Sequence, residues 1–192
     1  MSGPVAGPDG VLRCPWGLSS PEYVAYHDDE WGRPLETDDA MFERLTLEGF
    51  QSGLSWLIVL RKRPAFRTAF AGFAMQQVAG FDEHDVERLM ADAGIIRNRA
   101  KIVATIANAA AVIDLPGGLL QHVTSFRPAT PPPPPRTLAD LPAQTDESKA
   151  LAADLRKRGV RFVGPTTAYA LMQATGIVDD HLVGCASRGR WT

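Results

Sequence analysis

Residues 157–176 read KRGVRFVGPTTAYALMQATG, and their pattern is the most informative about the architecture. The apolar spacing predicts one helix that ends at about residue 157 and a second helix from about 165 to 176. Gly159 and Gly164 frame the tight connection between them. Two helices joined in this way aim backbone N–H groups at the start of the second helix toward an anion such as a phosphate. Glycine at a helix–helix turn is also common without any ligand, so both interpretations stay open.

Apolar residues recur at helical spacing along almost the whole chain, and no alternation of period two extends beyond a few residues. The pattern predicts an all-α protein. Glycines 49 and 53 lie so close together that they predict an interrupted pair of helices. The five consecutive prolines within residues 127–136 predict an extended, solvent-facing loop. The expected helices cover about residues 20–32, 38–49, 56–60, 64–70, 82–93, 98–113, 145–157 and 165–176.

Composition limits the classes of protein that this chain can represent. The 192 residues are 45% hydrophobic, which predicts one domain, or two small ones, with a real core. Twenty basic and 22 acidic side chains give a net charge of −2, so a polyanion must be bound by a local basic patch. No stretch resembles a signal peptide or a membrane span. We therefore expect a cytoplasmic protein without membrane association and without an obligate protein partner.

The most basic stretch surrounds the glycine hairpin, where a near-neutral protein would need its charge if it bound DNA. The same residues also suit the solvated faces and last turns of helices, because the helix dipole favours cations there. This stretch contains Lys149, Arg156, Lys157, Arg158 and Arg161.

Each of the two cysteines lies near a histidine in the sequence. Cys14 precedes His27, and His181 precedes Cys185 by four positions. Two thiolates and two imidazoles are the ligand set of a closed tetrahedral zinc site, which would join the N-terminal and C-terminal segments. The alternative is that the cysteines are small buried hydrophobes and the histidines ordinary surface residues. Spacing alone does not decide between them.

Aromatic residues and one carboxylate gather in the N-terminal third of the chain. Such side chains can stack on a flat, electron-poor ring, and a carboxylate among them favours a cationic ligand. Composition alone favours a simple core cluster instead. Glu48 supports the binding interpretation, because its apolar context, LTLEGFQSGLSW, would leave an ionised carboxylate desolvated without a partner or a ligand. The group consists of Trp16, Tyr23, Tyr26, Trp31, Glu48 and Trp56.

Several of these motifs, in collinear order, resemble the 3-methyladenine DNA glycosylase I family of the helix-hairpin-helix DNA glycosylase superfamily. The matching segments are Cys14 to Trp16, YVAYHDDEWG, LEGFQSGLSW, DAGIIRNRAKI, KRGVRFVGPTTAYALMQATG and VDDHLVGC. The resemblance covers residues 12–186 and implies one helical glycosylase domain there, with the hairpin at about 159–164. We expect residues 1–11 to be a flexible N-terminal tail and residues 187–192 a C-terminal tail.

The resemblance also implies roles for individual residues. The zinc ligands of the family fall on Cys14, His27, His181 and Cys185, which implies one structural zinc ion per chain. The base pocket falls on Glu48, Tyr26 and Trp56, with Trp16, Trp31 and Tyr23 beside them. Contacts to DNA fall on Gly53, Leu54, Gly159, Gly164, Pro165 and Thr166.

The implied activity is hydrolysis of the bond between N3-methyladenine and its sugar in alkylated double-stranded DNA. Bifunctional relatives carry a lysine where Thr166 stands, so the chain is expected to lack strand-cleaving lyase activity. Glu48 is the candidate catalytic residue, and Asp179 is a second candidate because relatives place an essential aspartate there. The alternative function is a helix-hairpin-helix module that binds DNA without catalysis.

Overall fold

The computed structural model describes residues 3–191 of the protein and is predominantly helical. Two strands, β1 (Val5–Ala6) and β2 (Leu12–Arg13), form a short antiparallel pair near the N-terminus. The helices are η1 (Pro15–Leu18), α1 (Pro21–Asp29), α2 (Asp38–Gln51), α3 (Trp56–Ala69), η2 (Ala71–Phe73), α4 (Met75–Ala79), α5 (Glu83–Ala91), α6 (Arg99–Val112), α7 (Gly118–Thr124), η3 (Leu138–Asp140), α8 (Asp146–Lys157) and α9 (Pro165–Ala174). The prediction of a helix-hairpin-helix architecture is confirmed, since α8 and α9 pack as neighbours on either side of the hairpin.

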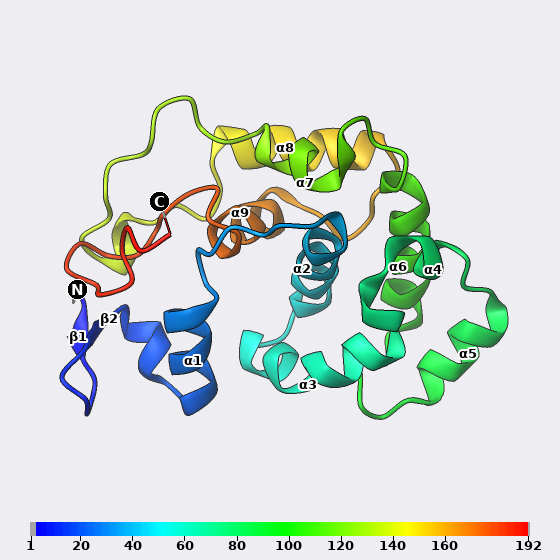
Figure 1. The fold of residues 1–192 in the computed structure, drawn as a ribbon, viewed down its shortest axis with the longest axis horizontal. Helices are drawn as coiled ribbons and strands as arrows, with labels where there is room; N and C mark the ends of the chain where they lie inside the picture. The colour runs from blue at the N-terminus through cyan, green and yellow to red at the C-terminus, as the bar shows by residue number, and fades with distance from the viewer. Residues whose placement is uncertain (1–2, 192) are drawn as a thin grey trace.

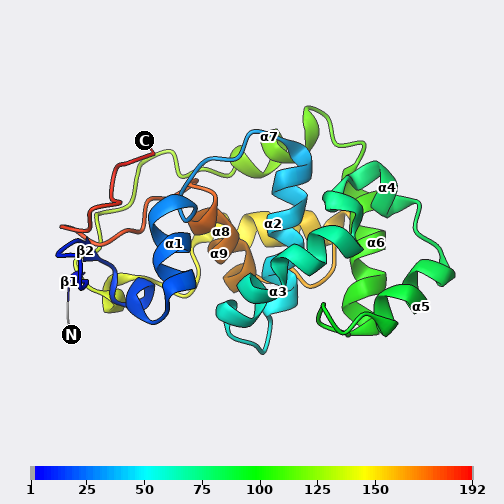
Figure 2. The same cartoon turned by 60° about the horizontal axis from the view of Figure 1, so that its bottom comes forward.

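The molecule is elongated, and α2 runs through its middle (Figure 1). Helices α4, α5 and α6 form one end of the molecule, and α7, α8 and α9 lie along one side of α2. At the opposite end, α1 lies beside the β1–β2 pair and the C-terminal segment, so the first and last described segments lie at the same end of the molecule (Figure 2). Backbone hydrogen bonds connect this end: Ala186 donates to the carbonyl of Leu12 at 2.8 Å, and Val183 donates to that of Pro135 at 2.8 Å.

The core forms around α2. Every residue of α2 from Met41 to Phe50 is buried except Glu43. Phenylalanines fill the space between α2, α3 and η2: Phe50 meets Phe66 edge-on at 4.8 Å, and Phe70 stacks on Phe73 at 5.6 Å. Each such ring contributes roughly 1.5–3 kcal/mol by leaving water. The consequence for function is that packing on several sides holds α2 in place, so its polar side chains have defined positions.

Most of the predicted helix boundaries agree with the structure to within a few residues. The N-cap of α2, expected at Asp38 or Asp39, is instead Thr37, whose hydroxyl accepts from the amide of Ala40. Residues 56–60 and 64–70 were expected to be separate, but α3 continues through Pro64. The proline removes one backbone hydrogen bond, but the buried face of α3 continues on both sides of it, and tertiary packing overrides the local preference. The short helices α4 and α7 have no counterpart in the predictions.

The segment 1–11, expected to be a tail, contributes β1 to the strand pair within its described part. Residues 187–191 also have specific contacts: Ser187 is buried, and Arg190 donates to the carbonyl of Asp28 at 2.6 Å. In the proline-rich loop, residues 130–134 are exposed and form neither helix nor strand. Among the described helices, none has the length and apolar character needed to cross a membrane.

Candidate functional site

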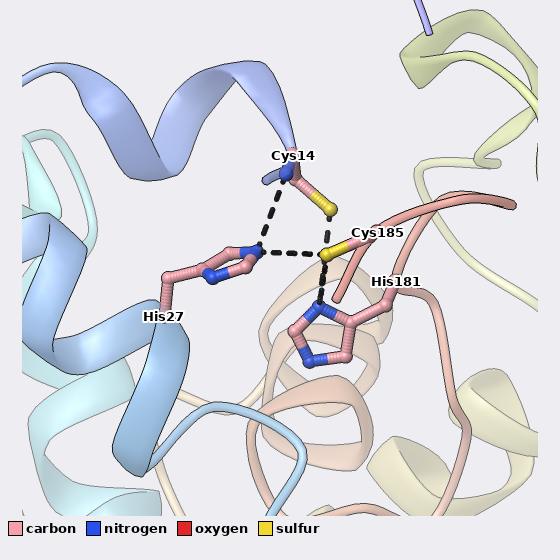
Figure 3. A group of neighbouring side chains, drawn as sticks. All are labelled: Cys14, His27, His181 and Cys185. Atoms are coloured by element: carbon pink, nitrogen blue, oxygen red, sulfur yellow. Dashed lines mark hydrogen bonds between the residues drawn. The ribbon is translucent and has the colours of Figure 1, made fainter. Parts of the chain in front are cut away.

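Four metal-ligating side chains meet where the two ends of the chain come together (Figure 3). Cys14 follows β2, His27 lies on α1, and His181 and Cys185 belong to the C-terminal segment. All four are buried, and their ligand atoms lie within 4.8 Å of one another. The structure therefore brings together the four residues that the sequence analysis proposed as ligands, although their two halves are more than 150 residues apart in the chain.

The distances within this cluster fit a tetrahedral ion. The Sγ of Cys185 lies 3.5 Å from Nε2 of His27 and 3.6 Å from Nδ1 of His181, and the Sγ of Cys14 lies 3.8 Å from the same Nδ1. Zinc bonds of ~2.3 Å to sulfur and ~2.0–2.1 Å to nitrogen place tetrahedral S and N ligands about 3.6 Å apart. The donor set and its spacing thus fit a metal ion of this kind.

Groups around the cluster fix both imidazoles in the orientation that a metal requires. Nδ1 of His27 lies 2.8 Å from a carboxylate oxygen of Asp28, and Nε2 of His181 lies 3.2 Å from the backbone oxygen of Trp31. Each ring thereby donates its N–H outward and turns its lone pair toward the sulfurs. Arg13 donates in turn to both oxygens of Asp28. Burial opposes ionisation of Asp28, but the hydrogen bonds from Arg13 and His27 outweigh it and lower the pKa of this carboxyl group.

The two thiols interact with each other, and the pKa of Cys14 is raised by its hydrogen bond with Cys185 and by burial. The hydrogen bond from the Cys14 thiol lowers the pKa of the Cys185 thiol, against the effect of burial. The amide of Leu182 also donates to Sγ of Cys14 at 3.4 Å. Gly17 is required locally, because a Cβ at that position would lie 2.9 Å from the ring of His27. This end of the molecule is built to hold two sulfur and two nitrogen ligands.

A cavity of about 400 Å³ lies beside this cluster, among α1, α2, α3 and α9. Its volume suits a single flat ring of purine size. All six residues that the sequence analysis assigned to base binding line it. The lining consists of Trp16, Ser19, Tyr23, Tyr26, Trp31, Glu48, Gln51, Trp56, Leu141, Ala170 and Gln173.

Glu48 supplies the carboxylate of this cavity. The residue is 5% exposed, and its side chain forms no hydrogen bond or ion pair within residues 3–191. Burial raises the pKa of Glu48 to about 7, although the nearby Arg44 acts to lower it. The indole N–H of Trp56 is likewise buried without a hydrogen-bond partner in the described chain. Two polar groups of the cavity wall are therefore left for a ligand to satisfy.

Tyr26 is held from behind by a buried guanidinium. Nη1 of Arg44 donates to the hydroxyl oxygen of Tyr26 at 2.7 Å, and the Arg44 guanidinium lies 5.3 Å from the Tyr26 ring and 5.7 Å from the Trp56 ring. Arg44 is itself balanced by Glu30 at 3.8 Å. Because the hydroxyl oxygen accepts from Arg44, its own proton is free to donate elsewhere, and desolvation raises the pKa of Tyr26 so that this proton is retained.

Trp16 and Trp31 connect the cavity to the Cys/His cluster. The Trp16 ring meets the Trp31 ring edge-on at 5.0 Å and the His27 ring at 5.1 Å, and the Trp31 ring lies 4.6 Å from that of His181. Tyr23 is anchored differently, since its hydroxyl accepts from the amide of Leu57 in the first turn of α3 at 3.1 Å. One wall of the cavity therefore rests on the histidines of the cluster.

The residues assigned to DNA contacts lie in two exposed turns. Gly53 and Leu54 occupy the turn between α2 and α3, where Gly53 has a φ of 83° and Leu54 is 40% exposed. Gly159 and Gly164 border the hairpin between α8 and α9, Pro165 is the first residue of α9, and Thr166 follows it. The start of α9 has Gly164 as its N-cap, so no side chain caps its amide groups.

Comparison with known proteins identifies the family. The family model for methyladenine glycosylases matches residues 16–188. The chain belongs to the methyladenine glycosylase family. It is 46% identical over 183 residues to DNA-3-methyladenine glycosylase 1 of Escherichia coli, which covers 90% of this chain and 95% of that protein. It is 40% identical over 181 residues to DNA-3-methyladenine glycosylase of Haemophilus influenzae, covering 91% and 97%.

A solved structure has the same fold. The structure that describes 3-methyladenine recognition by 3-methyladenine DNA glycosylase I from Staphylococcus aureus superposes with a TM-score of 0.86 at 32% identity, covering 92% of this chain and 96% of that one. The resemblance noted from the sequence motifs is thereby confirmed at the level of family and fold.

Within this methyladenine glycosylase, Asp179 lies outside the cavity lining. Its carboxylate accepts from the backbone amides of His181 at 3.1 Å and Gly189 at 3.0 Å. The adjacent Asp180 is buried, and it accepts from Gln173 at 2.8 Å and from Tyr169 at 2.5 Å. Of the two neighbouring acids, Asp180 is the one connected to the cavity, through Gln173.

Sequence reasoning missed several residues of this methyladenine glycosylase site. Arg44, Glu48 and Gln51 recur at positions i, i+4 and i+7 on one face of α2, and this polar stripe is a signal that could have placed Arg44 and Gln51 beside the cavity. Gln173 is a comparable polar residue within the apolar sequence of α9. Nothing in the local sequence marks Leu141, which reaches the cavity from the loop after η3.

Proposed function

We propose that this protein is a base-excision repair glycosylase that hydrolyses the N-glycosidic bond of N3-methyladenine in alkylated double-stranded DNA. The products are the free base and an abasic site. The observation that carries the proposal is the buried, unpaired carboxylate of Glu48 in a purine-sized cavity walled by aromatic rings. The names of the E. coli, H. influenzae and S. aureus relatives support the same activity.

The chemistry of the substrate explains the cavity. Alkylation at N3 makes the adenine ring cationic, so the base is a good leaving group and gains Coulomb and cation–π energy against a carboxylate and indole rings. Glu48 would accept hydrogen bonds from the amino edge of the base, and Trp56 would stack on the ring. The Tyr26 hydroxyl, whose oxygen accepts from Arg44, would donate its own O–H to the base. Trp16, Trp31 and Tyr23 complete the walls. Unmodified adenine gains less because it is neutral.

Bond cleavage then needs little further machinery. As the bond to the sugar breaks, its electron pair goes to the departing base, which becomes neutral, and water adds to the anomeric carbon and loses a proton to solvent. We keep Glu48 as the principal catalytic candidate, since it stabilises the cation inside the cavity. Asp179 stays the second candidate, and its position beyond the cavity makes it the easier one to exclude by substitution.

DNA would be held by the two exposed turns. The base must leave the duplex, which requires a few kcal/mol and least for damaged pairs. Gly53 and Leu54 would approach the gap that it leaves, and Gly159, Gly164, Pro165 and Thr166 would bind the backbone through the open start of α9. No lysine stands at position 166, so we propose hydrolysis without strand cleavage.

We further propose that the Cys/His cluster holds one zinc ion, with Cys14, His27, His181 and Cys185 as its ligands. Four protein ligands leave no open position, so such an ion stabilises the fold and supplies no reactive group. It would fix Trp16 and Trp31 through the two histidines. Free thiols that serve as ligands fit a reducing compartment such as the cytoplasm.

The decisive experiment is release of base from duplex DNA treated with a methylating agent, with the products identified by mass. We expect 3-methyladenine from the wild-type protein and an intact, abasic strand. A DNA-binding module without catalysis would bind the duplex in a salt-dependent way but release no base. That outcome would overturn the proposed function.

A further inference from the structure

Lys101 is a buried lysine whose partners are backbone carbonyls. It lies on α6, is 8% exposed, and its Nζ donates to the backbone oxygens of Phe50 and Ser52, each at 3.0 Å. No carboxylate in residues 3–191 pairs with it. The two carbonyls stand at the C-terminal end of α2, where helix carbonyls lack intrahelical partners and the helix dipole favours a cation. Lys101 therefore fixes the chain directly before Gly53 and Leu54.

Asn108 fixes the backbone of the hairpin between α8 and α9, as Lys101 fixes the chain before Gly53. Its Oδ1 accepts from the amide of Arg161 at 2.8 Å, and its Nδ2 donates to the carbonyl of the same residue at 3.1 Å. Asn108 is 6% exposed, whereas the Arg161 side chain faces solvent. This two-point contact mimics a peptide pairing, and it holds both the position and the direction of the hairpin backbone.

Both contacts come from one face of one helix. Lys101 and Asn108 are seven residues apart, which is two turns of α6 or about 10.5 Å along its axis. Phe162, next to Arg161 in the hairpin, bridges the two contact regions: its ring lies 5.9 Å from Nζ of Lys101, and its Cβ would meet a Cβ placed on Gly49 of α2 at 3.6 Å. The residue holds a positive φ of 57° and is 43% exposed.

We propose that α6 sets the distance between the two DNA-contacting turns, with Lys101 and Asn108 as positioning residues. The turn at 52–55 must reach the gap in the duplex while the hairpin at 159–164 holds the backbone, so the spacing between them decides whether an extruded base reaches the cavity. This inference rests on the proposed function. It adds two residues that touch neither the base nor the DNA.

The test separates base binding from action on duplex DNA. Lys101→Met and Asn108→Leu remove the polar contacts and keep the approximate side-chain volume. We expect each to lower kcat/KM for release of 3-methyladenine from methylated duplex by about 10- to 100-fold. Affinity for free 3-methyladenine, followed by tryptophan fluorescence, should stay within twofold of wild type. The kcat/KM of the double variant should be no more than about threefold below that of the less active single variant. The reason is that either change alone destroys the spacing, so the second change adds little.

Thr105→Val is the matched control. Thr105 is buried on the same face between the two residues, and its hydroxyl donates only to the carbonyl of Lys101 within α6. It should release base within twofold of wild type. Lys101→Arg, which keeps the cation and its donors, should recover most of the loss. Should Asn108→Leu not fold, Asn108→Asp loses only the bond donated to Arg161 and is expected to show a smaller fall of the same kind.

Three results would overturn the proposal: unchanged release by folded variants, additive losses in the double variant, or loss of free-base affinity by the same factor as release. Failure of the proposed function is a separate result, because it shows as no base released by the wild-type protein. In that case the spacing is read from binding to a duplex with a tetrahydrofuran abasic-site analogue. Lys101→Met and Asn108→Leu should each raise its Kd at least tenfold, and unchanged binding would contradict the inference.

Discussion

Two buried polar regions lie next to each other in this protein, the Cys/His cluster and the cavity that contains Glu48, and they differ in how their polar atoms are hydrogen-bonded. In the Cys/His cluster, both imidazoles donate outward, to Asp28 and to the carbonyl of Trp31, and Cys14 accepts from the backbone. In the cavity, by contrast, the carboxylate of Glu48 has no hydrogen-bond partner in the described chain. The same two tryptophans, Trp16 and Trp31, separate these regions.

The difference indicates what each region is for. A cluster whose every ligand is oriented by a neighbour stabilises the folded chain, because nothing is left for a further molecule to supply. An unpaired buried carboxylate lowers stability when it ionises, and a cationic ligand offsets that loss. Substitutions in the first region should therefore change stability, and substitutions in the second should change activity.

The largest expected effect is loss of stability when the Cys/His cluster is broken. Cys185→Ser should release the proposed zinc ion and lower the free energy of unfolding by at least ~3 kcal/mol, since metal binding by such sites contributes directly to folding. For a chain of this length the melting temperature should fall by about 6–12 °C. Ala186→Ser, at the exposed neighbouring residue, is the control. Elemental analysis measures the loss of the ion, and thermal melts measure the loss of stability. An unchanged melt would show that the cluster does not stabilise the fold by joining the two ends of the chain.

Removing the charge in the cavity should come next. Glu48→Gln keeps the shape of the side chain and loses a charge-assisted bond worth up to ~3 kcal/mol, so release of 3-methyladenine should slow by about 100-fold. The free energy of unfolding should not fall. Glu43→Gln makes the same change outside the cavity, on the same helix, and should keep its activity. Single-turnover base release is the measurement, and wild-type rates in Glu48→Gln would remove this carboxylate from the mechanism.

The pH dependence sharpens the same contrast. Burial raises the pKa of Glu48 from 4.5 to about 7, so the ionised form that binds a cation is lost as pH falls. Release by the wild type should decrease roughly tenfold per pH unit below 7 and reach a plateau near pH 8. Glu48→Gln should lack this limb. A wild-type profile that is flat between pH 5.5 and 8 would contradict the assignment.

The contribution of Glu48 to stability changes with pH in the opposite direction to its contribution to activity. A carboxyl group with a raised pKa binds its proton more tightly in the folded state, so its contribution to stability is complete below pH 4.5 and is lost as pH rises through 7. The Glu48→Gln variant should therefore gain stability relative to the wild type at pH 8. Thermal melts of both proteins at pH 5 and pH 8 check the sign.

The smallest effect is expected at Asp179. Asp179→Asn keeps a side-chain oxygen for one of its two backbone amide partners and lies outside the cavity, so base release should change less than threefold. A slight fall in melting temperature is expected from the weaker contact to Gly189. A loss comparable to that of Glu48→Gln would instead restore Asp179 as a catalytic residue.

Much of the site could be anticipated from local patterns. The hairpin showed in its glycines, the candidate ligands in their residue types, and Glu48 in its apolar surroundings. Arg44 and Gln173 were missed because their roles depend on contacts with other segments of the chain: Arg44 with Tyr26, and Gln173 with Asp180. Continuation of α3 through Pro64 was missed for the same reason, since packing against α2 outweighs the preference of a single residue.

The helical class, the hairpin, the family and the residue types of both buried groups could be predicted from the sequence alone, because they follow from periodicity and side-chain chemistry over short distances. The folded structure is needed to show that Glu48 is unpaired in the described chain while the imidazoles are oriented, that Asp180 and not Asp179 is hydrogen-bonded to the cavity residue Gln173, and that α6 contacts both exposed turns. Those properties depend on which groups from distant segments exclude water from one another, and burial of that kind exists only after the chain has folded.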